Sequence, residues 1–101
     1  MPDQVTIESF LAVDDAEFPH TRHALGTGIL TLNIPLNAQS VMIQALTQNI
    51  RYTLNGTNPS VDSGFQFKAG DPPRLISIGK YTVLKFFREA AGAVLELEYG
   101  R

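Results

Sequence analysis

The densest group of side chains that could perform chemistry lies near the start of the sequence. Three carboxylates and two imidazoles fall within ten residues, those of Asp14, Asp15, Glu17, His20 and His23. Oxygen and nitrogen donors of this kind bind divalent metals. Their spacing matches no metal-binding motif, and Pro19 interrupts any helix that would stack the two histidines. We therefore expect a solvated loop here, with a metal site as the minor alternative.

The glycine-rich and nucleophile motifs of common enzymes are not formed by this sequence. Gly26-Thr27-Gly28 has no third glycine in register, and Gly79-Lys80 is followed by Tyr81 instead of Ser or Thr. Neither stretch can make the backbone cradle that binds nucleotide phosphates. No serine lies in a Gly-x-Ser-x-Gly elbow, and the chain has no cysteine. We expect a protein that is not an enzyme and needs no cofactor.

The composition indicates one folded domain over residues 1–101. Hydrophobic residues make up 44% and charged residues 18% of the chain, which is typical of a domain with its own core. The net charge is -2 and the eight Lys and Arg residues are scattered, so no basic stripe is available for nucleic acid. The lack of cysteine excludes disulfides and is typical of intracellular proteins. We expect neither a signal peptide nor a membrane span, because the sequence shows no long apolar run.

Most of the chain alternates between apolar and polar side chains, as half-buried strands do. The expected strands are residues 5–13, 29–36, 41–46, 50–54, 65–69, 75–78, 81–88 and 93–99. The alternation is clearest in the last of these, where Ala93, Leu95, Leu97 and Tyr99 share one face. A helix over residues 38–48 competes with the third strand, but its cap is weak and the apolar run is short.

Turn residues separate these strands. Asn55-Gly56 can adopt the positive φ angles of a tight turn, and Pro72 and Pro73 stiffen the turn that follows the fifth expected strand. Residues 14–28 break the alternation with two aspartates, a proline and two glycines. We interpret that segment as a long irregular loop, and loops of such length are often functional or interfacial.

The sequence therefore predicts an all-β fold. Seven or eight short strands at this spacing are typical of two stacked sheets, because an isolated sheet cannot hide a whole apolar face. We expect an antiparallel β-sandwich with either a jelly-roll or an immunoglobulin-like topology.

The neighbouring residues Phe86 and Phe87 predict a second apolar surface. Successive strand residues face opposite sides of a sheet, so one ring enters the core and the other lies outside. Val83 would share the outer face with Phe87 and with the stem of Lys85. Such a face favours a partner, such as another copy of the chain, unless loops cover it.

Two resemblances attach to these strands and turns. Residues 52–59 (Tyr-Thr-Leu-Asn-Gly-Thr-Asn-Pro) are similar to the strand-turn signature of the immunoglobulin-like domain at the C-terminus of chitobiase and hexosaminidase-type enzymes, with Asn55 in place of its usual Asp. This resemblance implies a carbohydrate-binding or accessory domain, for which Tyr52 and Tyr81 are the residues to test.

The broader resemblance is to small structural proteins of tailed-bacteriophage virions. It is carried by residues 50–59 (Ile-Arg-Tyr-Thr-Leu-Asn-Gly-Thr-Asn-Pro), 69–73 (Ala-Gly-Asp-Pro-Pro) and 88–95 (Arg-Glu-Ala-Ala-Gly-Ala-Val-Leu). It implies a capsid cement or decoration protein, with a neck or tail component as the alternative. Such a protein would bind the major capsid protein or other virion proteins, and would form dimers or trimers. It would be assembled in the bacterial cytoplasm and lie on the capsid surface.

Partner contacts are then expected at the loop of residues 14–28 and at the second apolar face. The interface residues are Asp14, Asp15, Phe18, His20, Arg22, His23, Val83 and Phe87.

Overall fold

The computed structural model describes residues 18–78, 81 and 83–101. That part of the chain forms eight β-strands and no helix, which confirms the all-β class. The strands are β1 (Thr21–Ala24), β2 (Leu30–Asn33), β3 (Ser40–Leu46), β4 (Ile50–Thr53), β5 (Phe65–Phe67), β6 (Arg74–Ser77), β7 (Val83–Arg88) and β8 (Val94–Gly100). The strand expected at residues 5–13 lies outside the described residues.

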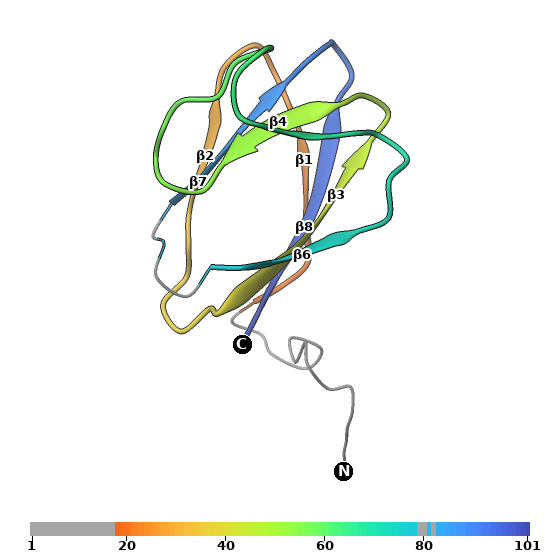
Figure 1. Cartoon of the computed structure of the whole chain (residues 1–101). Helices are drawn as coiled ribbons and strands as arrows, with labels where there is room; N and C mark the ends of the chain where they lie inside the picture. The colour runs from red at the N-terminus through yellow and green to blue at the C-terminus, as the bar shows by residue number, and fades with distance from the viewer. Residues whose placement is uncertain (1–17, 79–80, 82) are drawn as a thin grey trace.

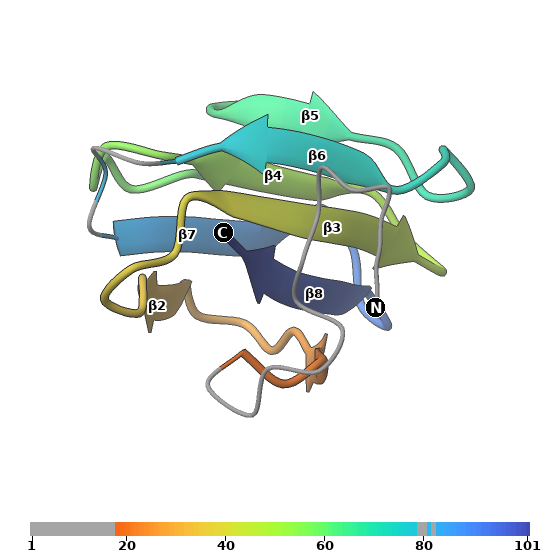
Figure 2. The same cartoon turned by 90° about the horizontal axis from the view of Figure 1, so that it is seen from below.

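The strands form two antiparallel sheets packed face to face, as expected for a β-sandwich (Figure 1). The β8 sheet has the order β1-β8-β3-β6, and the β7 sheet has the order β2-β7-β4-β5. In Figure 2 the β8 sheet lies in front of the β7 sheet.

The order of the strands distinguishes the two topologies left open by the sequence. The strands pair as β1–β8, β2–β7, β3–β6 and β4–β5, which is a nested order. A long hairpin wound into two sheets gives this nesting, and the result is a jelly roll. An immunoglobulin-like sandwich would pair the first strand with the second, whereas here β1 and β2 lie in different sheets.

The core lies between the sheets and takes alternate residues from the central strands. The largest side chains that fill it are fully buried: Phe18, Phe67, Phe86, Ile43, Ile50, Ile78, Leu84, Leu95, Leu97 and Val41. The alternation expected over residues 93–99 is confirmed, because its four apolar residues are buried and the intervening ones are half-buried. Residues 41–46 lie in β3, so the strand was the right choice over the competing helix.

The loop expected at residues 14–28 needs correction in the part that the structure describes. Thr21–Ala24 is the edge strand β1, paired with β8 from Leu97 to Val94. A search for alternating apolar residues does not detect β1, because its half-buried positions are occupied by Thr21 and His23. An edge strand of four residues gains its stability from the backbone ladder with its neighbour.

Phe18, expected to contact a partner, is instead part of the core of the monomer. Only 2% of its surface is exposed. The guanidinium of Arg101 lies over its ring, 5.3 Å from the centroid. Phe18 therefore anchors the chain just before β1 and is not available to another protein.

Replacing Leu97 with alanine should lower the free energy of unfolding by about 2–5 kcal/mol, because apolar contacts are lost and a cavity remains. Urea unfolding followed by far-UV circular dichroism measures this change. Leu36→Ala is the control, since the Leu36 side chain is 87% exposed and its loss should change stability by no more than about 0.5 kcal/mol. Equal effects of the two substitutions would contradict this description of the core.

Tyr99 should respond differently, because its buried hydroxyl has no hydrogen-bond partner among the described residues. Tyr99→Phe should raise the free energy of unfolding by about 1–2 kcal/mol at neutral pH, since an unpaired buried polar group costs about that much. Burial also raises the pKa of the Tyr99 phenol to about 12.

The raised pKa predicts a difference in alkaline stability between the native chain and Tyr99→Phe. In the unfolded chain the Tyr99 phenol ionises at about pH 10, whereas in the folded chain it stays neutral at that pH. The native chain therefore loses stability as the pH rises from about 10 to about 12. The Phe variant lacks this loss. Parallel stability curves of the two proteins between those pH values would contradict the burial of the hydroxyl.

Candidate functional site

The largest group of charged side chains in the described structure lies on the outer face of the β8 sheet. We call it the His20 cluster; its members are His20, Arg22, Glu96 and Glu98. Arg22 lies directly opposite Glu96 in the β1–β8 register and pairs with its carboxylate. Nδ1 of His20 lies 3.0 Å from Oε1 of Glu98, and its Nε2 contacts Oε1 of Glu96.

The two carboxylates determine the protonation of His20. Both ring nitrogens lie beside carboxylate oxygens, an arrangement that favours the imidazolium, in which both nitrogens donate. The hydrogen bonds to Glu96 and then Glu98 raise the pKa of His20. The hydrogen bond from His20 likewise lowers the pKa of Glu96. With His20 protonated, the cluster pairs two cations with two anions at the junction of β1 and β8.

The described surroundings of the His20 cluster are shallow and contain no hydroxyl nucleophile. A depression of only about 110 Å³ adjoins the cluster, with Met42, Gln44 and Pro73 in its lining. Neither serine nor threonine belongs to the cluster. Within residues 18–78, 81 and 83–101, no group of three or more His, Asp or Glu side chains is placed to hold a metal ion.

The structure separates His20 from His23, the two histidines that the sequence placed in one candidate group. His20 contacts the outer-face carboxylates, whereas His23 is half-buried and its Nε2 lies 3.0 Å from Oγ1 of Thr21. Strand alternation causes this separation, because residues of opposite parity face opposite sides of β1. Asp14 and Asp15 lie outside the described residues.

The predicted second apolar face lies on the outside of the β7 sheet. Phe86 is fully buried and Phe87 is half-buried, as expected of neighbours on a strand. Val83 is half-buried as well. Part of this face is covered by residues 54–64, which we call the β4–β5 loop.

Hydrogen bonds hold the β4–β5 loop against this sheet. Nζ of Lys85 donates to Oδ1 of Asn58 at 2.6 Å, and Nη1 of Arg51 donates to the carbonyl oxygen of Gly64 at 3.1 Å. A Cβ atom added to Gly56 would lie 3.6 Å from Cγ1 of Val83, so the loop backbone passes close to that side chain.

Arg51 is itself fixed by Glu89. Its Nε donates to Oε2 of Glu89 at 2.6 Å, and Nε2 of Gln66 donates to the same oxygen at 2.8 Å. Burial acts to raise the pKa of Glu89, but the hydrogen bonds from Gln66 and Arg51 outweigh it and lower that pKa. The loop, β4, β5 and the end of β7 are therefore joined by one polar network.

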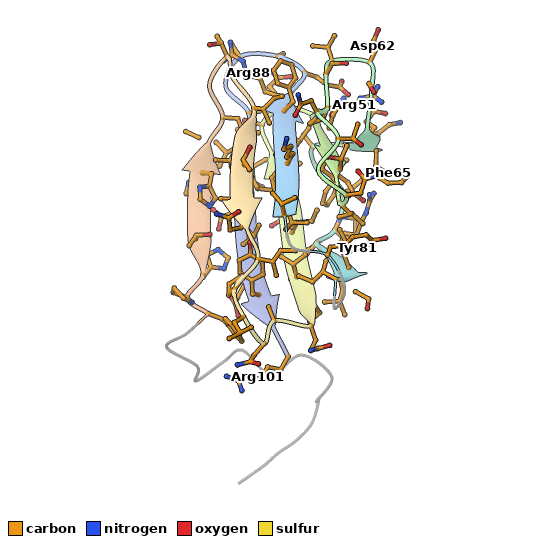
Figure 3. All side chains as sticks on the ribbon, turned by 90° about the vertical axis from the view of Figure 1, so that its left-hand side faces the viewer. Arg51, Asp62, Phe65, Tyr81, Arg88 and Arg101 are labelled. Carbon is orange, nitrogen blue, oxygen red and sulfur yellow. The ribbon has the colours of Figure 1, made fainter. Side chains whose placement is uncertain are left out.

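The aromatic residues divide between the core and a surface hollow. Tyr52 is buried, with its ring centroid 5.6 Å from that of Phe65 and 6.3 Å from that of Phe86. Phe65 is 63% exposed although strand alternation assigns it to the core side. Phe65 and half-buried Tyr81 both line the hollow, on the same side of the body (Figure 3).

No family model, curated protein or solved structure matches the chain. Within the part of the chain that the structure describes, no helix is long and apolar enough to cross a membrane.

The His20 cluster predicts a pH-dependent contribution to stability. An NMR titration should place the midpoint of the His20 imidazole above the ordinary value of 6.5, and Glu98→Gln should lower that midpoint. A raised pKa means that the ring binds its proton more tightly in the folded state than in the unfolded state. The stability that His20 adds is therefore complete below about pH 6.5 and is lost as the pH rises through the raised value.

Comparison with His20→Gln isolates this contribution. The difference in free energy of unfolding between the native chain and the variant should shrink as the pH rises across that range. A difference that stayed constant would show that the cluster does not hold the imidazolium.

Proposed function

We propose that the chain is a non-enzymatic structural protein of a tailed-bacteriophage virion, and within the virion a cement or decoration protein that binds the major capsid protein. The observation that carries the proposal is the jelly-roll order of the eight strands. This architecture recurs in viral capsid domains, although it also recurs in lectins and cupins. The step from fold to role is an analogy, and the virion resemblance of the C-terminal half directs it to the virion.

The three segments that carry the resemblance meet at one end of the sandwich. Arg51, in the first segment, pairs with Glu89, in the third. The backbone N–H of Ala69, in the second, donates at 2.9 Å to Oδ1 of Asn49, which directly precedes the first. The N–H of Glu89 donates at 3.0 Å to the carbonyl oxygen of the same Asn49. Hydrogen bonds of Asn49 and the ion pair between Arg51 and Glu89 thus connect the three segments. This connection supports treating the resemblance as more than a set of unrelated turns.

The arrangement of the charges also favours a protein that acts by binding other proteins and not by catalysis. The charges of His20, Arg22 and Arg51 are paired with glutamates inside the monomer. None of these groups is combined with a nucleophile in the described residues. The proposed contact surface is the outer face of the β7 sheet, where Val83 and Phe87 remain half-buried beside the exposed Asn33.

A charge placed on this face tests the proposal. Asn33→Glu adds a carboxylate on the edge strand β2, opposite Val83 in the register. A carboxylate buried without a partner at a protein interface costs several kcal/mol, so binding should weaken by more than about tenfold. Ser77→Glu is the matched control, because it adds the same charge to an exposed site on β6, the edge strand of the other sheet.

The measurement is co-sedimentation of the purified chain with shells assembled from the major capsid protein of the same genome. The native chain and Ser77→Glu should sediment with the shells, and Asn33→Glu should remain in the supernatant. Sedimentation velocity on the free chain should show self-association. A native chain that stayed monomeric and ignored the shells would refute the cement role, and equal binding by both variants would exclude this face as the contact.

A further inference from the structure

A surface hollow lies beside Phe65, between β4, β5 and Tyr81. Its volume is about 550 Å³, within the range of roughly 300–1,000 Å³ that is typical of small-molecule sites. The end of β4, the β4–β5 loop, the first residue of β5 and Tyr81 form its walls. All of the described residues that line it are uncharged.

The walls of the hollow are held in place without a ligand. Gly64 has a φ of +107°, and a Cβ there would lie 3.1 Å from the carbonyl oxygen of Tyr52 and 3.2 Å from Cβ of Pro59. Only glycine fits this close approach without a shift. Ser60 and Ser63 bond to each other through backbone N–H and C=O groups at 2.9 and 3.3 Å. A tilted ring contact with buried Tyr52 supports the exposed ring of Phe65. Fixed walls reduce the ordering cost of binding.

The polar groups around the hollow are short, neutral donors and acceptors. Oδ1 of Asn55 accepts the N–H of Thr57 at 3.2 Å, which leaves the amide NH₂ of Asn55 as its group for a ligand. The side-chain hydroxyls of Thr57 and Ser63 make no hydrogen bond within the described residues. Two aromatic rings, Phe65 and Tyr81, supply the apolar part of the lining.

The chemistry of this lining selects among ligands. Among the described residues that line the hollow there is neither a cation for a phosphate or carboxylate ligand nor a carboxylate for a basic ligand, which favours a neutral ligand. A sugar ring in the pyranose form has a flat face of C–H groups and a rim of hydroxyls, so it complements an aromatic wall with amide and hydroxyl neighbours. We propose that this hollow binds a pyranose unit of a neutral carbohydrate. The proposal does not depend on the virion role.

The test uses the intact purified chain, labelled with ¹⁵N, and two neutral probes, cellotetraose and chitotetraose. Binding of at least one of them should shift the amide signals of Asn55, Thr57 and Gly64 at probe concentrations up to about 10 mM, which detects a Kd in the millimolar range. Phe65→Ala should weaken that binding by about tenfold, because one aromatic wall is lost.

Leu36→Ala is the matched control for Phe65→Ala. It removes another exposed apolar side chain, 87% exposed and outside the hollow, and should bind as the native chain does. The amide spectrum of each variant shows whether it is folded. Ser63→Ala provides a second, milder variant, which should weaken binding through the loss of one hydroxyl without altering the ring contact between Phe65 and Tyr52.

Three results would overturn the proposal: no shift with either probe, shifts confined to residues outside the hollow, or equal affinity of Phe65→Ala and the native chain. Failure here is distinguishable from failure of the cement role, because sugar binding is measured on the free chain and shell binding by co-sedimentation. Phe65→Ala that loses the sugar but still sediments with shells would place the two activities on separate surfaces.

Discussion

The antiparallel pairing of β3 with β8 is the contact on which the rest of the structure depends. The two strands pair from Ser40 opposite Gly100 to Leu46 opposite Val94. In this register the buried residues of both strands face the core and the half-buried residues between them face outward. A slip of one residue would turn every buried side chain of a strand to the solvent. The register also places β1 and β6 on the two flanks of the pair, which completes the β8 sheet.

The sequence was sufficient for the parts of the fold that local alternation governs. The long central strands β3 and β8 each carry buried residues at every second position, so period-two patterning identifies them and their inner faces. The same rule separated Phe86 from Phe87. It failed at β1, because an edge strand with half-buried Thr21 and His23 has no apolar stripe to detect. Period-two patterning also could not distinguish a jelly-roll from an immunoglobulin-like order of strands. That choice depends on the pairing of β1 with β8, which is a contact between the two ends of the described chain.

The candidate surfaces were harder still to predict from the sequence. They too depend on contacts between residues that lie far apart in the chain. His20 meets Glu96 and Glu98 across 76 and 78 residues of sequence, so the cluster exists only once β1 and β8 are in register. Phe65 has the parity of a core residue, yet it begins a three-residue edge strand and has little structure beyond it to cover the ring. The loop over Val83 could be suspected from Asn55-Gly56 and Pro59, but its direction across the β7 sheet depends on Lys85 and Arg51.

The distribution of charge bears on how this molecule can recognise anything outside itself. The strongest ion pairs join strands of one monomer: Arg22 and His20 with the β8 glutamates, and Arg51 with Glu89. Breaking such pairs to bind a partner would cost the stability that they supply. Two other surfaces offer mainly neutral or apolar groups, the hollow beside Phe65 and the outer face with Val83. Recognition by shape and apolar burial depends weakly on salt, unlike recognition by exposed charges. The jelly roll thus uses the charges of the His20 cluster, Arg51 and Glu89 in contacts within the chain. The contacts proposed for the hollow and for the face with Val83 rely on neutral and apolar groups.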